Sequence, residues 1–128
     1  MISKSNLLPK GNREKSGNNY VTNDGECMKG SVEATLSVIG GKWKPIILYQ
    51  LAFGTRRFGE IAARIPIISR KVLTEQLKEL ENDKLIKREY FKEIPPRVEY
   101  SLTELGESLT PLFEEMAKWG NQYILSKQ

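Results

Sequence analysis

The order of elements in this chain is decided by residues 69–102, which read SRKVLTEQLKELENDKLIKREYFKEIPPRVEYSL. The first part, 69–83, has leucines at the spacing of one helix face and predicts a helix capped by Ser69. Two segments follow, 86–91 and 97–102, which are rich in β-branched and aromatic residues and flank a loop with two prolines. Proline lacks the amide hydrogen that a strand needs, so this pattern predicts a β-hairpin with the prolines in its loop.

Three more helices are expected upstream of this stretch. Apolar spacing predicts a first helix capped by Ser31, a dense apolar run predicts a buried second helix whose first turn holds Pro45, and a third helix is expected to end before Pro66. A helix, a short turn, a helix and then a hairpin is the order of a winged helix. The expected fold is therefore mainly α with a small β-hairpin wing. The aromatic residues expected in its core are Trp43, Tyr49, Phe53, Phe58 and Phe113.

A last helix is expected after Thr103, which can cap it, and Pro111 within it must kink or restart it. Its apolar residues recur at intervals of four and three, the spacing of a helix–helix seam. This seam predicts a homodimer interface, and packing on its own domain is the open alternative. The seam residues are Leu105, Leu109, Leu112, Met116, Trp119 and Tyr123.

Composition limits the classes of protein that this chain can belong to. It has 128 residues, which suits one domain, and we expect a disordered polar tail over 1–26 and a winged-helix domain with a C-terminal dimerisation helix over 27–128. The absence of histidine and the single cysteine exclude Cys/His zinc sites and histidine-based catalysis, so we expect no metal or cofactor. No apolar stretch reaches the length of a membrane span or forms a secretory signal, and a cytoplasmic location is expected.

Enzymatic activity is not expected from the motifs. The spacing of Gly25 and Gly30 fits a phosphate-binding loop, but Ser31 stands where the motif requires lysine. A second candidate, residues 40–42, has the lysine, but Trp43 follows it where the motif requires serine or threonine. No nucleophile with a recognisable base is evident either. We therefore predict a binding protein rather than an enzyme.

Basic residues concentrate in the part that holds the helix-turn-helix and most of the hairpin. Residues 42–97 carry thirteen basic and seven acidic groups. Their net charge of +6, thirteen minus seven, exceeds the net charge of +4 of the whole chain. On a helical wheel, the polar positions of 69–83 point away from its leucine stripe. Their side chains can meet base edges and phosphates in a major groove, and a solvated helix face is the open alternative. These residues are Ser69, Arg70, Lys71, Thr74, Glu75 and Lys78.

The hairpin carries a second group of cations that can contact phosphates or the minor groove as a wing. An edge strand protected by charge and proline is the open alternative for the same residues. The wing cations are Lys87, Arg88, Lys92 and Arg97.

Four motifs in order resemble one family. Residues 38–43 read VIGGKW, 56–61 read RRFGEI, 68–74 read ISRKVLT and 95–103 read PPRVEYSLT. Together they resemble the HxlR-type winged helix-turn-helix transcriptional regulators of the MarR-like superfamily, and the resemblance covers about residues 31 to 125.

The resemblance implies a cytoplasmic bacterial or archaeal homodimer that forms through its N-terminal and final helices and binds palindromic operators near promoters. It assigns the groove-reading role to Ser69, Arg70, Lys71 and Thr74, and the wing contact to Arg97. By analogy with the family, the regulator is a repressor. The alternative is a winged-helix module that binds protein and no DNA, because a fold does not dictate its function.

Cys27 is the remaining candidate. Some HxlR-type proteins have a cysteine just before the first helix that senses oxidants or electrophiles, but that position corresponds more closely to Gly30 here. With one cysteine in the chain, a protein disulfide would have to join two chains. A redox sensor and an incidental thiol are both open interpretations, and an unknown small-molecule or oxidant effector is the partner that a sensor would imply.

Overall fold

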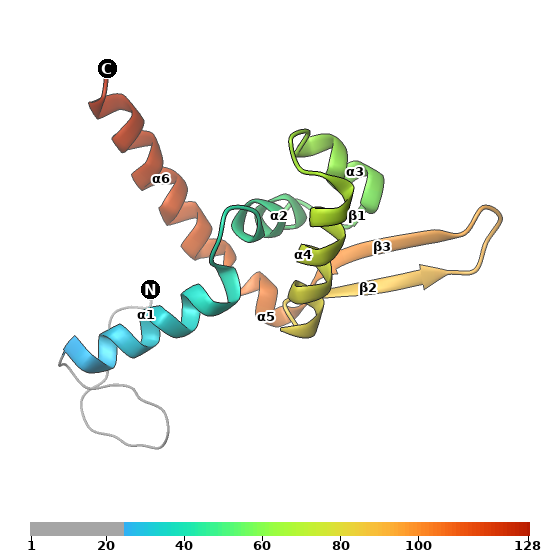
Figure 1. The fold of residues 1–128 in the computed structure, drawn as a ribbon, viewed down its shortest axis with the longest axis horizontal. Coiled ribbons are helices and arrows are strands. Elements are labelled where there is room, and N and C mark those ends of the chain that lie inside the picture. The colour runs from blue at the N-terminus through green and yellow to red at the C-terminus, as the bar shows by residue number, and fades with distance from the viewer. Residues whose placement is uncertain (1–24) are drawn as a thin grey trace. The chain divides into compact units, whose positions relative to one another are not determined.

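The computed structural model describes residues 25–128, with side chains from Gly30 onward. The chain divides into helix α1 and a second compact unit, residues 41–128 (Figure 1). The elements are α1 (Gly25–Ile39), α2 (Lys44–Leu51), β1 (Arg56–Arg57), α3 (Phe58–Arg64), α4 (Arg70–Asn82), β2 (Ile86–Phe91), β3 (Arg97–Leu102), α5 (Glu104–Glu107) and α6 (Thr110–Ser126).

Helix α1 begins earlier than the sequence predicts. It starts at Gly25, so Ser31 lies inside the helix instead of capping it, and the Thr35 hydroxyl donates a hydrogen bond to the Ser31 carbonyl oxygen at 3.0 Å. Of the predicted disordered tail, residues 1–24 lie outside the described residues, and the last two belong to α1. Serine is a good cap but is also tolerated within a helix, so the residue type alone did not locate the helix start.

The helix-turn-helix forms as predicted. Helix α3 ends at Arg64 before Pro66, and α4 begins after Ser69, whose hydroxyl oxygen accepts a hydrogen bond from the Val72 amide at 3.1 Å. The predicted leucine stripe of α4 is buried, and it packs in a core with α2, α3 and the start of β2. The most deeply buried side chains are Ile47, Leu48, Ile61, Leu73, Leu77, Leu80 and Ile86.

Of the five aromatic residues predicted in the core, only Phe113 is buried: Trp43, Tyr49 and Phe58 are half-buried, and Phe53 is 67% exposed. Phe53 follows the end of α2, where Gly54 adopts a φ of 142° that turns the chain toward β1. Its ring instead packs edge-on against Tyr49, with the centroids 5.2 Å apart. Phe53 lies beyond the last buried residue of the helix, Leu51, and periodicity does not show where the core ends.

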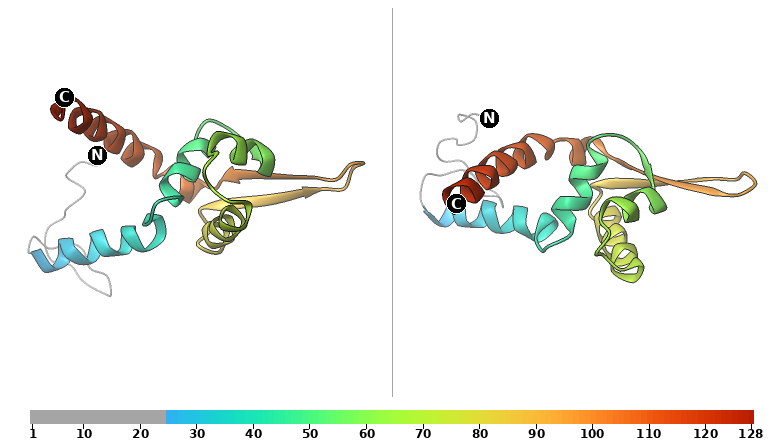
Figure 2. Two further views of the ribbon diagram at one scale, coloured as in Figure 1. Left: turned by 45° about the horizontal axis from the view of Figure 1, so that its top comes forward. Right: turned by 90° about the horizontal axis from the view of Figure 1, so that it is seen from above.

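The predicted hairpin is present, and a short strand joins it. Strands β2 and β3 pair antiparallel over the predicted residues, and β1 pairs with β3, so the sheet order is β1-β3-β2. Strand β1 is two residues long and carries no periodicity of its own, so the sequence does not predict it. The hairpin and α6 extend in opposite directions from the helices α2–α4 (Figure 2).

The last predicted helix is divided in two. Helix α5 is capped by Thr103, whose hydroxyl oxygen accepts from the Gly106 amide at 3.0 Å, and α6 restarts at Thr110 with Pro111 in its first turn. Restart was one of the two outcomes expected from this proline. Gly106 is buried, and a Cβ atom there would collide with the carbonyl oxygen of Leu85, so α5 can approach the start of β2 only because this residue is glycine.

Candidate nucleic-acid interface

The outer face of α4 is exposed to solvent along its length. Leu73, Leu77 and Leu80 are 0%, 2% and 0% exposed, and this burial fixes the rotation of the helix about its axis. The polar positions then point outward, as the helical wheel predicts. All six predicted groove-reading residues are exposed: Ser69, Arg70, Lys71, Thr74, Glu75 and Lys78.

Several of these side chains also have partners within the chain. Ser69 caps the helix, the Thr74 hydroxyl donates to the Arg70 carbonyl oxygen at 2.8 Å, and the Arg70 guanidinium lies 5.3 Å from the centroid of the Phe58 ring. These contacts fix the orientation of the first turn of α4. Because the Thr74 hydroxyl is already hydrogen-bonded, its methyl group is the part left to contact a ligand. Among the described residues, neither Lys71 nor Lys78 forms an ion pair, so both ammonium groups are available to an anion.

Helix α4 and the hairpin share a hollow of about 290 Å³. Lys78 enters it from α4 and Arg88 from β2, so a cation of the predicted recognition helix and one of the predicted wing border the same open space. Buried Tyr100 also lines it, and Glu81 is the one acidic side chain that does so. The lining residues are Thr74, Leu77, Lys78, Glu81, Arg88 and Tyr100.

The four predicted wing cations do not lie together. Side chains alternate between the two faces of a strand, and directly paired residues share a face. Arg88 pairs with Tyr100 and shares the face that meets α4, while Lys87 pairs with Ser101 on the opposite face. Lys92 is exposed in the loop between the strands.

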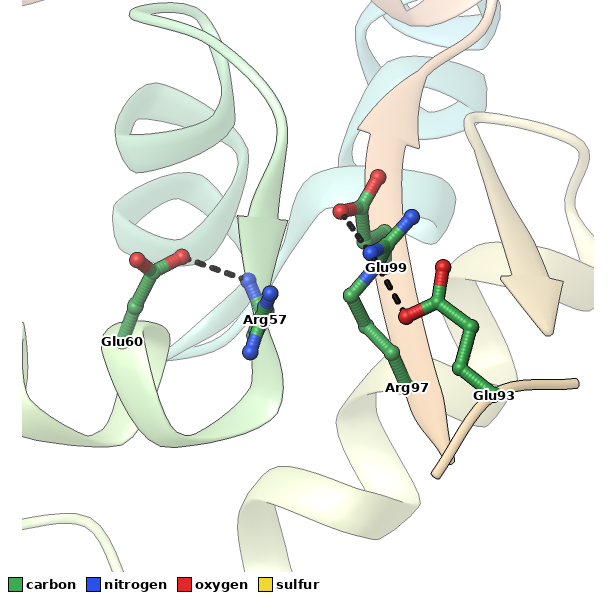
Figure 3. Close-up of polar contacts among 5 residues, drawn as sticks. All are labelled: Arg57, Glu60, Glu93, Arg97 and Glu99. Atoms are coloured by element: carbon green, nitrogen blue, oxygen red, sulfur yellow. Dashed lines mark hydrogen bonds and ion pairs between the residues drawn. The ribbon is translucent and has the colours of Figure 1, made fainter. Parts of the chain in front are cut away.

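Arg97 pairs with Phe91 on the same face as Lys87, and its guanidinium is held within the wing. Its Nη1 donates to Oε1 of Glu93 at 2.9 Å, and its Nε lies 3.0 Å from Oε2 of Glu99 (Figure 3). The guanidinium carbon also lies 4.1 Å from the centroid of the Phe91 ring. The resemblance implied a free cation for DNA at this position, and the structure places it among partners from its own hairpin.

The predicted seam is open to solvent. Leu109 is half-buried, and the other five seam residues are exposed, from 39% for Leu112 to 66% for Trp119. The rings of Trp119 and Tyr123 stack with centroids 5.3 Å apart and an interplanar angle of 11°. Because the chain restarts between α5 and α6, Leu105 lies on α5, Leu109 is the N-cap residue of α6, and the other four seam residues lie on α6.

Two polar contacts that position the interface were not predicted. Lys44 Nζ on α2 lies 2.6 Å from Oε1 of Glu79 on α4, and Arg56 Nε donates to the Gln50 carbonyl oxygen at the end of α2 at 3.5 Å. Both contacts join residues of different elements. Helical spacing could have shown that Glu79 lies off the groove-reading face, but the partner of Glu79 depends on how α2 packs.

Comparison with known proteins decides the family. Residues 38–128 match the HxlR-like helix-turn-helix family. The chain belongs to this family. Its sequence is 49% identical over 109 residues to the HTH-type transcriptional regulator YdeP of Bacillus subtilis, and the match covers 85% of this chain and 84% of YdeP.

Solved structures agree with this assignment. The redox regulator HypR in its oxidised form is 48% identical, with a TM-score of 0.69 over 72% of this chain and 95% of that one. The reduced form of the regulator YodB from B. subtilis is 41% identical, with a TM-score of 0.65 over 73% of this chain and 91% of that one.

The HxlR-type protein is a transcriptional regulator with a DNA-binding, winged helix-turn-helix domain. In the described part of the chain, no helix combines the length and the apolar character that crossing a bilayer requires. Cys27 lies in the first turn of α1.

Proposed function

We propose that this HxlR-type protein is a cytoplasmic repressor that binds a palindromic operator as a homodimer. The observation that carries the proposal is the exposed outer face of α4, whose cations have no ion-pair partner among the described residues while its inner face is fixed in the core. A helix presented in this way can enter a major groove without any rearrangement of its own domain.

The side chains of α4 have different roles in this proposal. Arg70, Lys71 and Lys78 meet guanine edges or phosphates, Thr74 offers its methyl group to a thymine, and Glu75 accepts from a cytosine amino group. The first turn, capped by Ser69, presents backbone N–H groups and the positive end of the helix dipole to a phosphate. In the wing, Lys87, Arg88 and Lys92 supply contacts to the sugar-phosphate backbone.

The seam on α5 and α6 supports the homodimer. Its exposed leucine, methionine and aromatic side chains form more apolar surface than a small monomer usually leaves in water. A second copy of the chain, related by a two-fold axis, would cover the seam and present a second α4. Two such helices read two half-sites separated by about one turn of duplex or a multiple of it, which makes the operator palindromic.

The test is a titration of binding to the DNA upstream of the protein's own gene against salt concentration. If several cations contact phosphates, the logarithm of the affinity falls with the logarithm of the salt concentration at a slope of about 0.9 per phosphate contact. Lys71→Glu should weaken specific binding about 100-fold or more and leave the melting curve unchanged, because the side chain points away from the core. Lys118→Glu, with the same change of charge at an exposed position of α6 off the seam, is the control.

A module that binds protein and no DNA is the competing function. Such a module would show no affinity for duplex at any salt concentration, and Lys71→Glu would have no effect to measure. Footprinting then separates a dimeric regulator from a monomeric one, because only a dimer protects two symmetric half-sites.

We also propose that Cys27 makes the regulator responsive to oxidants. The support is that the related HypR is named a redox regulator and that YodB has been solved after diamide treatment and with a bound quinone. Because the chain has one cysteine, two thiols from two chains would lose two electrons and two protons to diamide and form one disulfide. Diamide should produce a reducible covalent dimer and change operator affinity in the wild type, whereas Cys27→Ser should show neither effect. An incidental thiol would leave affinity unchanged.

A further inference from the structure

The geometry of the wing points to a role for Arg97 that differs from the one implied by family resemblance. We infer that Arg97 is a positioning residue: it holds the wing tip, residues 92–96, in the shape that meets DNA, and does not itself contact the duplex. This inference rests on the proposed function and concerns how the same wing binds.

Arg97 contacts two carboxylates and one aromatic ring of its own hairpin. One carboxylate from the wing tip, Glu93, and one from β3, Glu99, lie on its guanidinium (Figure 3). The guanidinium also lies over the Phe91 ring. The side chain is 23% exposed, and its Nε atom is buried without a hydrogen-bond partner among the described residues, so Nε meets Glu99 as an ion pair only. A phosphate approaching Arg97 would have to displace carboxylates that already neutralise the guanidinium.

The wing tip depends on such a contact because its backbone offers little. Pro95 and Pro96 have no N–H group to donate, so they cannot extend the ladder of β2 and β3. The last ladder pair is Phe91 with Arg97, and the Glu93 amide donates to the Phe91 carbonyl oxygen at 3.0 Å. The ion pair from Arg97 to Glu93 therefore ties the loop to the end of the ladder.

What this arrangement presents to DNA is the rest of the wing tip. Lys92 is exposed, and the Ile94 side chain is as exposed as it would be in an extended chain, at 101%. A lysine can pair with a phosphate, and an exposed apolar side chain can contact sugars or the floor of a minor groove. With Glu93 held on Arg97, its negative charge is offset, which lowers its repulsion of the duplex.

The deciding experiment is the effect of Glu93→Gln on affinity for the upstream DNA at fixed salt. If Arg97 contacts DNA, removing the carboxylate that competes for it tightens binding. If Arg97 positions the loop, the same change weakens binding about two- to fivefold, the range expected for one partly exposed ion pair, even though a negative charge has been removed. Glu89→Gln is the matched control, since Glu89 is on the same hairpin and forms no ion pair among the described residues.

Arg97→Lys is the second variant. Lysine keeps the charge and would keep a phosphate contact, but it cannot bond two carboxylates and stack on a ring in the manner of a planar guanidinium. The positioning role predicts that Arg97→Lys weakens binding as much as Glu93→Gln does. Wild-type affinity in Arg97→Lys, or binding by Glu93→Gln as tight as that of Glu89→Gln, would overturn the inference.

A measurement on the free protein separates this inference from the proposed function. Backbone ¹⁵N heteronuclear NOE values at Lys92, Glu93 and Ile94 should fall in Glu93→Gln and Arg97→Lys and stay at wild-type values in Glu89→Gln. If the wild type binds no duplex, the proposed function fails, and this measurement still decides whether Arg97 orders the loop. Unchanged values in all variants would show that it does not.

Discussion

Helices α4 and α6 are both amphipathic, yet they differ in what covers their apolar stripes. The stripe of α4 is closed off by α2, α3 and β2, and none of its three leucines is more than 2% exposed. The stripe of α6 is open: Leu112, Met116 and Trp119 are 39%, 46% and 66% exposed. The polar faces differ as well, because α4 carries several cations near the basic wing, while α6 pairs Lys118 with Glu115.

The difference shows that the same amphipathic pattern can present either its polar face or its apolar face to solvent. In α4 the apolar stripe is used within the chain, so its polar face is held out in a fixed direction and is suited to recognition. In α6 the apolar stripe itself is the exposed surface, which the proposed homodimer would cover.

The largest effect is expected where the α4 stripe is interrupted. Leu77→Ala should lower the free energy of unfolding by about 2 to 5 kcal/mol, because it leaves a cavity in a fully packed site. Chemical denaturation measures this loss, with Leu112→Ala as the matched truncation on α6. Equal losses of unfolding free energy at the two positions would contradict the conclusion that the α4 stripe is packed and the α6 stripe is open.

A smaller effect is expected when a charge is placed on the α6 stripe. Met116→Asp should weaken self-association about tenfold or more and leave the fold of the domain unchanged, because an unpaired carboxylate would be buried between two copies. Sedimentation equilibrium gives the association constant. Ala117→Asp, one position off the stripe and also exposed, is the control. If Met116→Asp unfolded the chain, the stripe would be part of the domain's own core.

The smallest effect is expected at the ion pair between α2 and α4. Glu79→Gln should lower the free energy of unfolding by less than about 1 kcal/mol, because Glu79 is 54% exposed and solvent screens the pair. Thermal melting at low and high salt measures the loss, which should shrink as salt is added. A loss as large as that of Leu77→Ala would mean that charge and not packing holds α4 in place.

Much of the fold could be predicted because it depends on local pattern. The periodicity of 69–83, the cap at Ser69 and the prolines at Pro66 and Pro111 predicted the helix ends, and the strand-rich segments predicted the hairpin at its correct bounds. Even the rotation of α4 followed from the sequence, since a narrow leucine stripe can face only one way into a core.

The sequence did not predict features that depend on neighbours distant in the chain. Strand β1 exists because β3 offers it an edge, and α5 can approach Leu85 because Gly106 has no side chain. The partners of Arg97 are close to it in the chain, but a pattern of cations does not select them: the hairpin register pairs it with Phe91, and alternation along β3 puts Glu99 on the same face.

What this sequence determined by itself was therefore the order of the elements and the outward direction of α4, because both depend on residue spacing along one helix or strand. Only the tertiary structure decided which cations are free and which are held. A charged side chain has many possible partners in sequence, and the packing of the strands selects among them.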